Sequence, residues 1–97
     1  MRLRDMTYKD YGIQPEEVAR LRRACRSRAE SFKVLCEAAI SINAEIADDI
    51  VYSLVNCLSY ERISNIKTIP INRVDFYKYQ MATVAKFKEL TDKKQQS

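Results

Sequence analysis

The stretch from Leu58 to Phe87, LSYERISNIKTIPINRVDFYKYQMATVAKF, decides the fold of this 97-residue chain. Ser59 can cap a short helix whose apolar positions are Ile63 and Ile66. Pro70 then stops the helix, because proline has no backbone N–H to donate and restricts the residue before it. The stretch therefore predicts one short helix that ends at a turn.

The residues after this turn predict a second, longer helix. Asn72 is a good cap, and the helical pattern continues to about Asp92, after which residues 93–97 are expected to fray. A short helix, a turn of about three or four residues and a second helix form the helix-turn-helix plan. We expect this motif at about residues 59–88.

Residues 58–78 resemble, without a gap, the promoter-reading C-terminal region of bacterial sigma factors, in the style of small phage sigma-like transcriptional regulators. The dipeptide Ile69-Pro70 lies at the turn of that pattern. The positions that match its apolar and turn residues are Leu58, Ser59, Tyr60, Glu61, Ile63, Ile66, Ile69, Pro70, Ile71 and Val74. The resemblance implies a DNA-binding transcription regulator of phage or mobile-element type.

The resemblance also implies which residues touch duplex DNA. Lys67 and Thr68 would lie at the phosphate backbone, while the helix that starts at Asn72 would enter the major groove. Arg73 would pair with guanine and Gln80 with adenine. The full predicted set is Lys67, Thr68, Asn72, Arg73, Phe76, Tyr77 and Gln80.

The orientation of this last helix follows from placing its residues about 100 degrees apart. Its inward arc is then predicted to hold Val74, Tyr77, Met81, Val84 and Ala85, with Lys88 as a further candidate. Its outward arc is predicted to hold Arg73, Phe76, Tyr79, Gln80, Thr83 and Phe87. The outward arc is thus rich in aromatic side chains.

These outward residues leave a second function open. Asp75, Tyr77 and Gln80 stand where sigma factors commonly have cations, and phosphates would repel the anionic Asp75. An aromatic face of Phe76, Tyr79 and Phe87 would suit a protein interface. The alternative is a small protein-binding module, a phage-type inhibitor or adaptor that keeps the helix-turn-helix as scaffold. Its partner would be RNA polymerase, another protein or a second copy of the chain.

A dense group of arginines lies upstream. Pro15 and the two glutamates after it predict the start of a helix. Its apolar stripe is Val18, Leu21, Ala24 and Cys25, and its other face carries Arg20, Arg22, Arg23, Arg26 and Arg28. One interpretation is that these arginines form a solvated face that complements the helix dipole. The alternative is that they bind a partner, either phosphates beside the helix-turn-helix or an acidic protein.

The middle of the chain predicts two further helices. Ser27–Glu30 has the spacing of a capping box, although one unbroken helix from Glu16 to Ile42 is the alternative. Ala38 and Ala39 would let a neighbouring helix approach closely. Asn43 is a good cap for the helix that follows.

Length and composition favour one all-α domain of four to five helices over residues 15–92. One glycine and two prolines leave few turns. Residues 1–14 are expected to form an extended arm whose Tyr11 and Ile13 dock on the core. The net charge of +4 permits a nucleic-acid partner without requiring one.

No pattern indicates catalysis, a metal or a cofactor. The chain has no histidine, and Cys25, Cys36 and Cys57 lack metal-ligand spacing and fit small, reduced core residues. Asp48 and Asp49 fit the first turn of a helix better than an acid–base pair. We therefore expect no enzyme, no cofactor and no metal. No apolar run approaches the roughly 18 residues of a membrane span, so we also expect no membrane partner and a cytoplasmic location.

Overall fold

The computed structural model describes residues 6–27 and 29–96, and among these residues it contains helices and no strand. The elements are a 3-10 turn η2 (Lys9–Tyr11) and the helices α1 (Pro15–Ala24), α2 (Ala29–Asn43), α3 (Ala47–Asn56), α4 (Tyr60–Ser64) and α5 (Arg73–Gln96). The predicted all-α class with four to five helices is confirmed. Residues 1–5 of the predicted arm, Arg28 and Ser97 lie outside the described residues.

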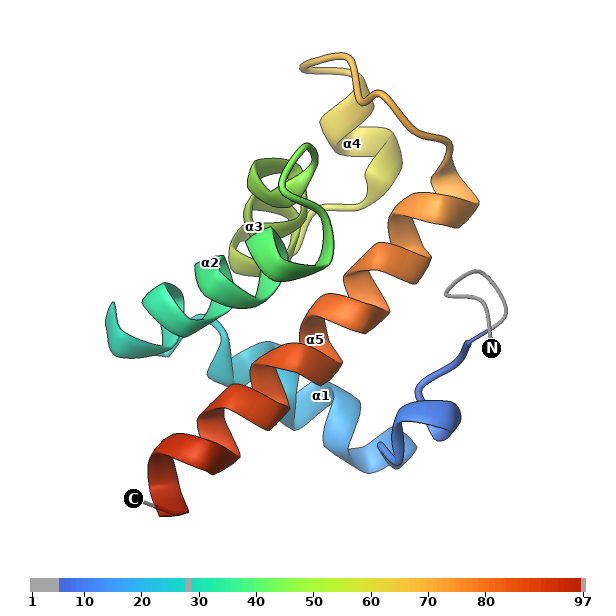
Figure 1. Cartoon of the computed structure of the whole chain (residues 1–97). Coiled ribbons are helices and arrows are strands. Elements are labelled where there is room, and N and C mark those ends of the chain that lie inside the picture. Colours follow the sequence, from blue (N-terminus) through green and yellow to red (C-terminus); the bar gives the residue numbers. More distant parts are fainter. Residues whose placement is uncertain (1–5, 28, 97) are drawn as a thin grey trace.

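The long helix α5 is the element on which the others pack. It runs diagonally across the molecule, with α2 and α3 on one side, α4 beside its first turns, and α1 crossing nearer its C-terminal end (Figure 1). Its most extensive contact is with α2. Ala38 and Ala39 of α2 are fully buried, as the predicted close approach of a neighbouring helix requires.

The boundaries of the upstream helices follow local side-chain chemistry. α1 begins at Pro15, and it is separate from α2, so the prediction of two helices is confirmed and the unbroken alternative is wrong. Ser27 Oγ donates to the carbonyl oxygen of Ala24 at 3.0 Å, just after α1 ends. Asn43 is not the cap of α3: it is the last residue of α2, and its Oδ1 accepts a hydrogen bond from the backbone N–H of Glu45 at 3.0 Å. The polar side chain thus forms the turn between the two helices.

The described part of the N-terminal arm is docked, as expected. Ile13 is buried in the core, and Tyr11 packs against it. Between them Gly12 has a φ of 74°, a left-handed conformation that glycine adopts without steric cost. The arm is also less extended than expected, because Lys9–Tyr11 form a 3-10 turn.

The two predicted C-terminal helices are present, but their connection differs from the expectation. Ser59 caps α4 as predicted, since its Oγ accepts a hydrogen bond from the backbone N–H of Arg62 at 3.3 Å. α4 ends at Ser64 and α5 begins at Arg73, so the connection is longer than the expected turn. α5 also continues to Gln96 rather than ending at about Asp92. The sigma-like helix-turn-helix stays a prediction.

The predicted orientation of α5 is wrong at several positions, although Val84, which is predicted to face inward, is fully buried. Phe76, Thr83 and Phe87 were expected to face outward but are buried, with 0%, 0% and 1% of their surfaces exposed. Val74, expected inside, is 57% exposed. The physical reason is size, because burying two phenylalanine rings removes more apolar surface from water than burying one valine. The polar Thr83 tolerates burial since its Oγ1 donates to the carbonyl oxygen of Tyr79 at 2.8 Å.

The three cysteines are predicted to react with a thiol reagent in a fixed order. Cys57 is exposed, Cys36 is partly buried, and Cys25 is buried. Burial raises the pKa of Cys25 to about 12, which removes the reactive thiolate. In an assay with the thiol reagent dithiobis(nitrobenzoic acid) at pH 8, we expect Cys57 to react first and Cys25 only after unfolding. The Cys57→Ser variant should lose the fast phase, whereas a single rate for all three thiols in the folded protein would contradict this assignment.

Candidate nucleic-acid interface

The structure places three of the seven predicted DNA-contacting residues inside or partly inside the protein. Phe76 is fully buried and packs its ring against Tyr60, with 5.4 Å between the ring centroids. Gln80 is only 3% exposed. Tyr77 is partly buried, and its hydroxyl accepts a hydrogen bond from the backbone N–H of Tyr60 at 3.2 Å. The predictions that Phe76 and Gln80 face a DNA groove are therefore wrong.

The other four predicted residues are exposed, and three of them have partners within the chain. Lys67 Nζ lies 2.7 Å from Oδ1 of the buried Asp49, and this hydrogen bond raises the pKa of Lys67. Arg73 Nε lies 2.9 Å from Glu61 Oε1, and its guanidinium lies over the Tyr77 ring. The remaining two, Thr68 and Asn72, are described next.

Asn72 has the role that its sequence position predicted. Its Oδ1 accepts a hydrogen bond from the backbone N–H of Asp75 at 2.9 Å, which caps the start of α5. Thr68 is exposed in the connection between α4 and α5. Of the residues predicted to enter the major groove, only Asn72 and Arg73 are thus exposed, and the two predicted phosphate contacts, Lys67 and Thr68, are exposed as well.

The predicted alternative protein interface does not form. Phe76 and Phe87 belong to the core, and Tyr79 is partly buried against it. An aromatic face that points to solvent would need all three rings outside. The structure therefore corrects this prediction together with the orientation of α5.

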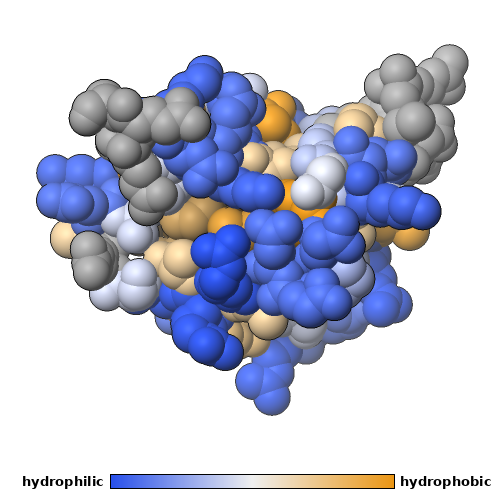
Figure 2. Space-filling model, turned by 90° about the horizontal axis from the view of Figure 1, so that it is seen from below, coloured by the Kyte–Doolittle hydropathy of each residue, from blue (hydrophilic) through white to orange (hydrophobic). Residues whose placement is uncertain are grey.

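The arginines of α1 do gather on one surface. Arg22, Arg23 and Arg26 line a hollow of about 600 Å³ between α1 and the junction of α3 and α4. The remaining lining comes from apolar and small polar residues, and none of the described residues that line it is acidic. The face that carries α1 is largely hydrophilic, with apolar side chains showing between the polar ones (Figure 2). We call the hollow that Arg22, Arg23 and Arg26 line the arginine hollow.

A chain of hydrogen bonds fixes Arg22 at this hollow. Its Nη2 donates to Gln80 Oε1 at 3.2 Å, and Gln80 Nε2 donates to Ser53 Oγ at 2.9 Å. Ser53 Oγ in turn donates to the carbonyl oxygen of Leu58 at 2.6 Å. The network joins α1, α5, α3 and the connection between α3 and α4. The buried Gln80 therefore holds the guanidinium of the partly exposed Arg22 in position.

Arg26 lies at the C-terminal end of α3. Its Nη1 lies 2.7 Å from Cys57 Sγ and 3.5 Å from the carbonyl oxygen of Leu54. Carbonyl groups at a helix end carry partial negative charge, so the guanidinium is favoured there. Cys57 adopts a φ of 55°, the left-handed conformation of a residue that ends a helix.

The four described arginines of the predicted phosphate-contacting face, Arg20, Arg22, Arg23 and Arg26, do not share one environment. Arg20 does not line the hollow, and its Nη2 pairs with Glu17 Oε2 at 3.2 Å. Arg23 lines the hollow and is exposed, and its side chain makes no hydrogen bond or ion pair with the described part of the chain. Arg23 is thus the arginine that is most available to an external anion.

Sequence reasoning missed the residues that complete this surface. Ser53, Cys57 and Ser59 line the hollow from α3 and the residue that caps α4. Ser53 is a polar residue among the apolar positions of α3. Because buried polar side chains are almost always hydrogen-bonded, its position indicates a hydrogen-bond partner in the core. The partner itself, Gln80, is buried, although the helical spacing predicts that it faces outward.

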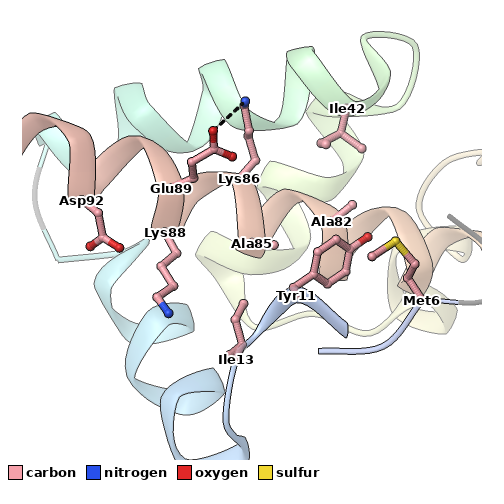
Figure 3. A pocket seen from close by; sticks show the side chains of 10 residues that line it. All are labelled: Met6, Tyr11, Ile13, Ile42, Ala82, Ala85, Lys86, Lys88, Glu89 and Asp92. Carbon is pink, nitrogen blue, oxygen red and sulfur yellow. Dashed lines mark ion pairs between the residues drawn. The ribbon is translucent and has the colours of Figure 1, made fainter. Parts of the chain in front are cut away.

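A second hollow lies between the N-terminal arm and α5. Tyr11 and Ile13 line it together with Ala82 and Ala85 (Figure 3). The lysines at its rim have partners within the chain, because Lys86 pairs with Glu89 at 3.6 Å and Lys88 with Glu17 at 3.2 Å. This hollow is therefore less suited to an anion than the arginine hollow.

No protein-family model, curated protein or solved structure matches the chain. Within the described residues, no helix has the length and apolar character needed to cross a membrane. In the same part of the chain, no three or more cysteine, aspartate or glutamate side chains are grouped so that they could hold a metal ion. The surface chemistry of the chain itself therefore supplies the basis for a functional proposal.

Proposed function

We propose that the protein binds duplex DNA, and that Arg22, Arg23 and Arg26 supply most of the affinity by contacting phosphates. The observation that carries the proposal is the convergence of these three side chains on one hollow without an acidic neighbour among the described lining residues. Guanidinium groups fork onto phosphate oxygens, and such contacts are largely independent of base sequence. Sequence-tolerant binding is the expected result.

The start of α5 would supply the contacts that depend on sequence. Asn72 and Arg73 are the exposed residues there that can donate hydrogen bonds to base edges. The exposed pair between Arg73 and Glu61 is weak enough to exchange, because such pairs contribute about 0–1 kcal/mol. A role in transcription regulation rests on the resemblance of residues 58–78 to sigma factors.

Arg23→Gln tests this proposal against a matched control, Arg20→Gln. Both arginines are exposed on α1, and both substitutions remove one charge, but only Arg23 lines the hollow. We expect Arg23→Gln to weaken binding of a labelled random-sequence duplex about three- to tenfold, and to reduce the slope of log K against log salt by about 1. Fluorescence anisotropy between low and physiological salt measures both quantities.

The control decides where the contact lies. Arg20→Gln should change affinity less than Arg23→Gln and leave the salt slope nearly unchanged. Equal effects of the two substitutions would show a general effect of charge and overturn the assignment to the arginine hollow. No binding of duplex DNA at low salt would overturn the proposed function.

A further inference from the structure

An apolar hollow lies between α2 and α3, on a surface separate from the arginine hollow. Its volume is about 280 Å³, and its apolar lining includes Phe32, Cys36 and Ile40 from α2 and Val51, Tyr52 and Val55 from α3. The α2 residues recur every four positions and therefore share one side of the helix. The hollow follows the seam between two adjacent helices, which is a shape that can receive a third helix.

The side chains around this hollow expose an unusual amount of apolar surface. Five large apolar residues of the described chain are exposed, and three of them, Phe32, Ile40 and Tyr52, line this one hollow. Single exposed apolar residues are ordinary, whereas a cluster of them marks an interaction surface. The α2–α3 surface is therefore a candidate docking site.

The charge of this region differs from that of the rest of the chain. Residues 29–59 have five acidic residues and one basic residue, Lys33, although the whole chain has a net charge of +4. Asp48 is the one charged residue among the described residues that line the hollow. Burial and, to a smaller extent, the carboxylate of Asp48 raise the pKa of Cys36, which also lines the hollow. Glu37 and Glu45 are exposed on the same part of the chain.

We propose that the hollow between α2 and α3 binds an amphipathic helix of a partner protein, with apolar side chains on one face and lysine or arginine beside them. The apolar face would cover Phe32, Ile40 and Tyr52, and the cations would lie near Asp48. A symmetric pair of two copies is a poorer occupant, because a two-fold interface would place the same acidic surface on both sides. The docking surface goes beyond the proposed DNA binding and does not depend on it.

The probes are two labelled synthetic peptides of 18 residues or so, a length that gives about five helical turns. They share leucines at helical spacing and differ in their flanking residues, which are lysine in one and glutamate in the other. We expect the lysine peptide to bind about tenfold more tightly or better, as measured by fluorescence anisotropy. Ile40→Gln should weaken its binding by at least about tenfold.

Ile66→Gln is the matched control, because Ile66 is also exposed but does not line the hollow. It should leave the affinity for the lysine peptide within about twofold. Equal binding of both peptides, no binding of either, or equal effects of the two substitutions would overturn the proposal. So would a dimer, detected by analytical ultracentrifugation, that Ile40→Gln abolishes and Ile66→Gln preserves, since a second copy would then occupy the hollow.

Discussion

Phe76→Ala is expected to lower the free energy of unfolding by about 3–5 kcal/mol, the usual cost of removing a buried phenylalanine side chain. Phe76 is fully buried and contacts the rings of Tyr60 and Tyr77, at centroid distances of 5.4 and 5.7 Å. The substitution would leave a cavity where α4 meets α5 and remove both ring contacts. Urea denaturation followed by circular dichroism measures the loss.

The matched control is Val74→Ala, two residues earlier on the same helix. Val74 is 57% exposed, so the change should be within about 0.5 kcal/mol. If Phe76→Ala fails to fold, Phe76→Leu should still fold with a smaller loss, of about 1 kcal/mol. Equal, small effects of Phe76→Ala and Val74→Ala would contradict the orientation of α5 in the structure and favour the outward aromatic face predicted from sequence.

The sequence predicted those features of the fold that depend on local chemistry. Pro15 begins α1, Ser59 caps α4, and the side chain of Asn72 caps the start of α5, because each acts through its own backbone or that of its neighbours. The apolar stripe of α1 also follows directly, since Leu21 and Cys25 are buried. Such features need no knowledge of distant residues.

The orientation of α5 and the arginine hollow depend on contacts between residues far apart in sequence. The apolar residues of α5 are spread around the helix, so their spacing did not identify one buried face. Gln80 looked like a surface residue, because its partners Ser53 and Arg22 come from α3 and α1. The charge of Arg20–Arg26 was visible in the sequence, but which arginines converge was set by the packing of α1 against the end of α3.

Gln80→Ala is expected to cost about 2–3 kcal/mol of unfolding free energy, as the sum of two lost hydrogen bonds and a small cavity. Gln80 is buried and links Arg22 of α1 to Ser53 of α3. Thermal and urea unfolding of the purified variant measure the loss. A cost no larger than that of Val74→Ala would contradict the network.

Gln80→Met separates the cost of the lost hydrogen bonds from the cost of the cavity. Methionine nearly fills the volume of glutamine but makes neither hydrogen bond. Ser53 Oγ would keep its bond to the carbonyl oxygen of Leu58, and the partly exposed Arg22 could turn to water, so no buried group is left without a partner. The expected cost is therefore smaller, about 1 kcal/mol. Since Arg22 would lose its fixed position, DNA affinity should fall in Gln80→Met although every arginine remains. An unchanged affinity would show that the network stabilises the fold without positioning Arg22 for phosphate.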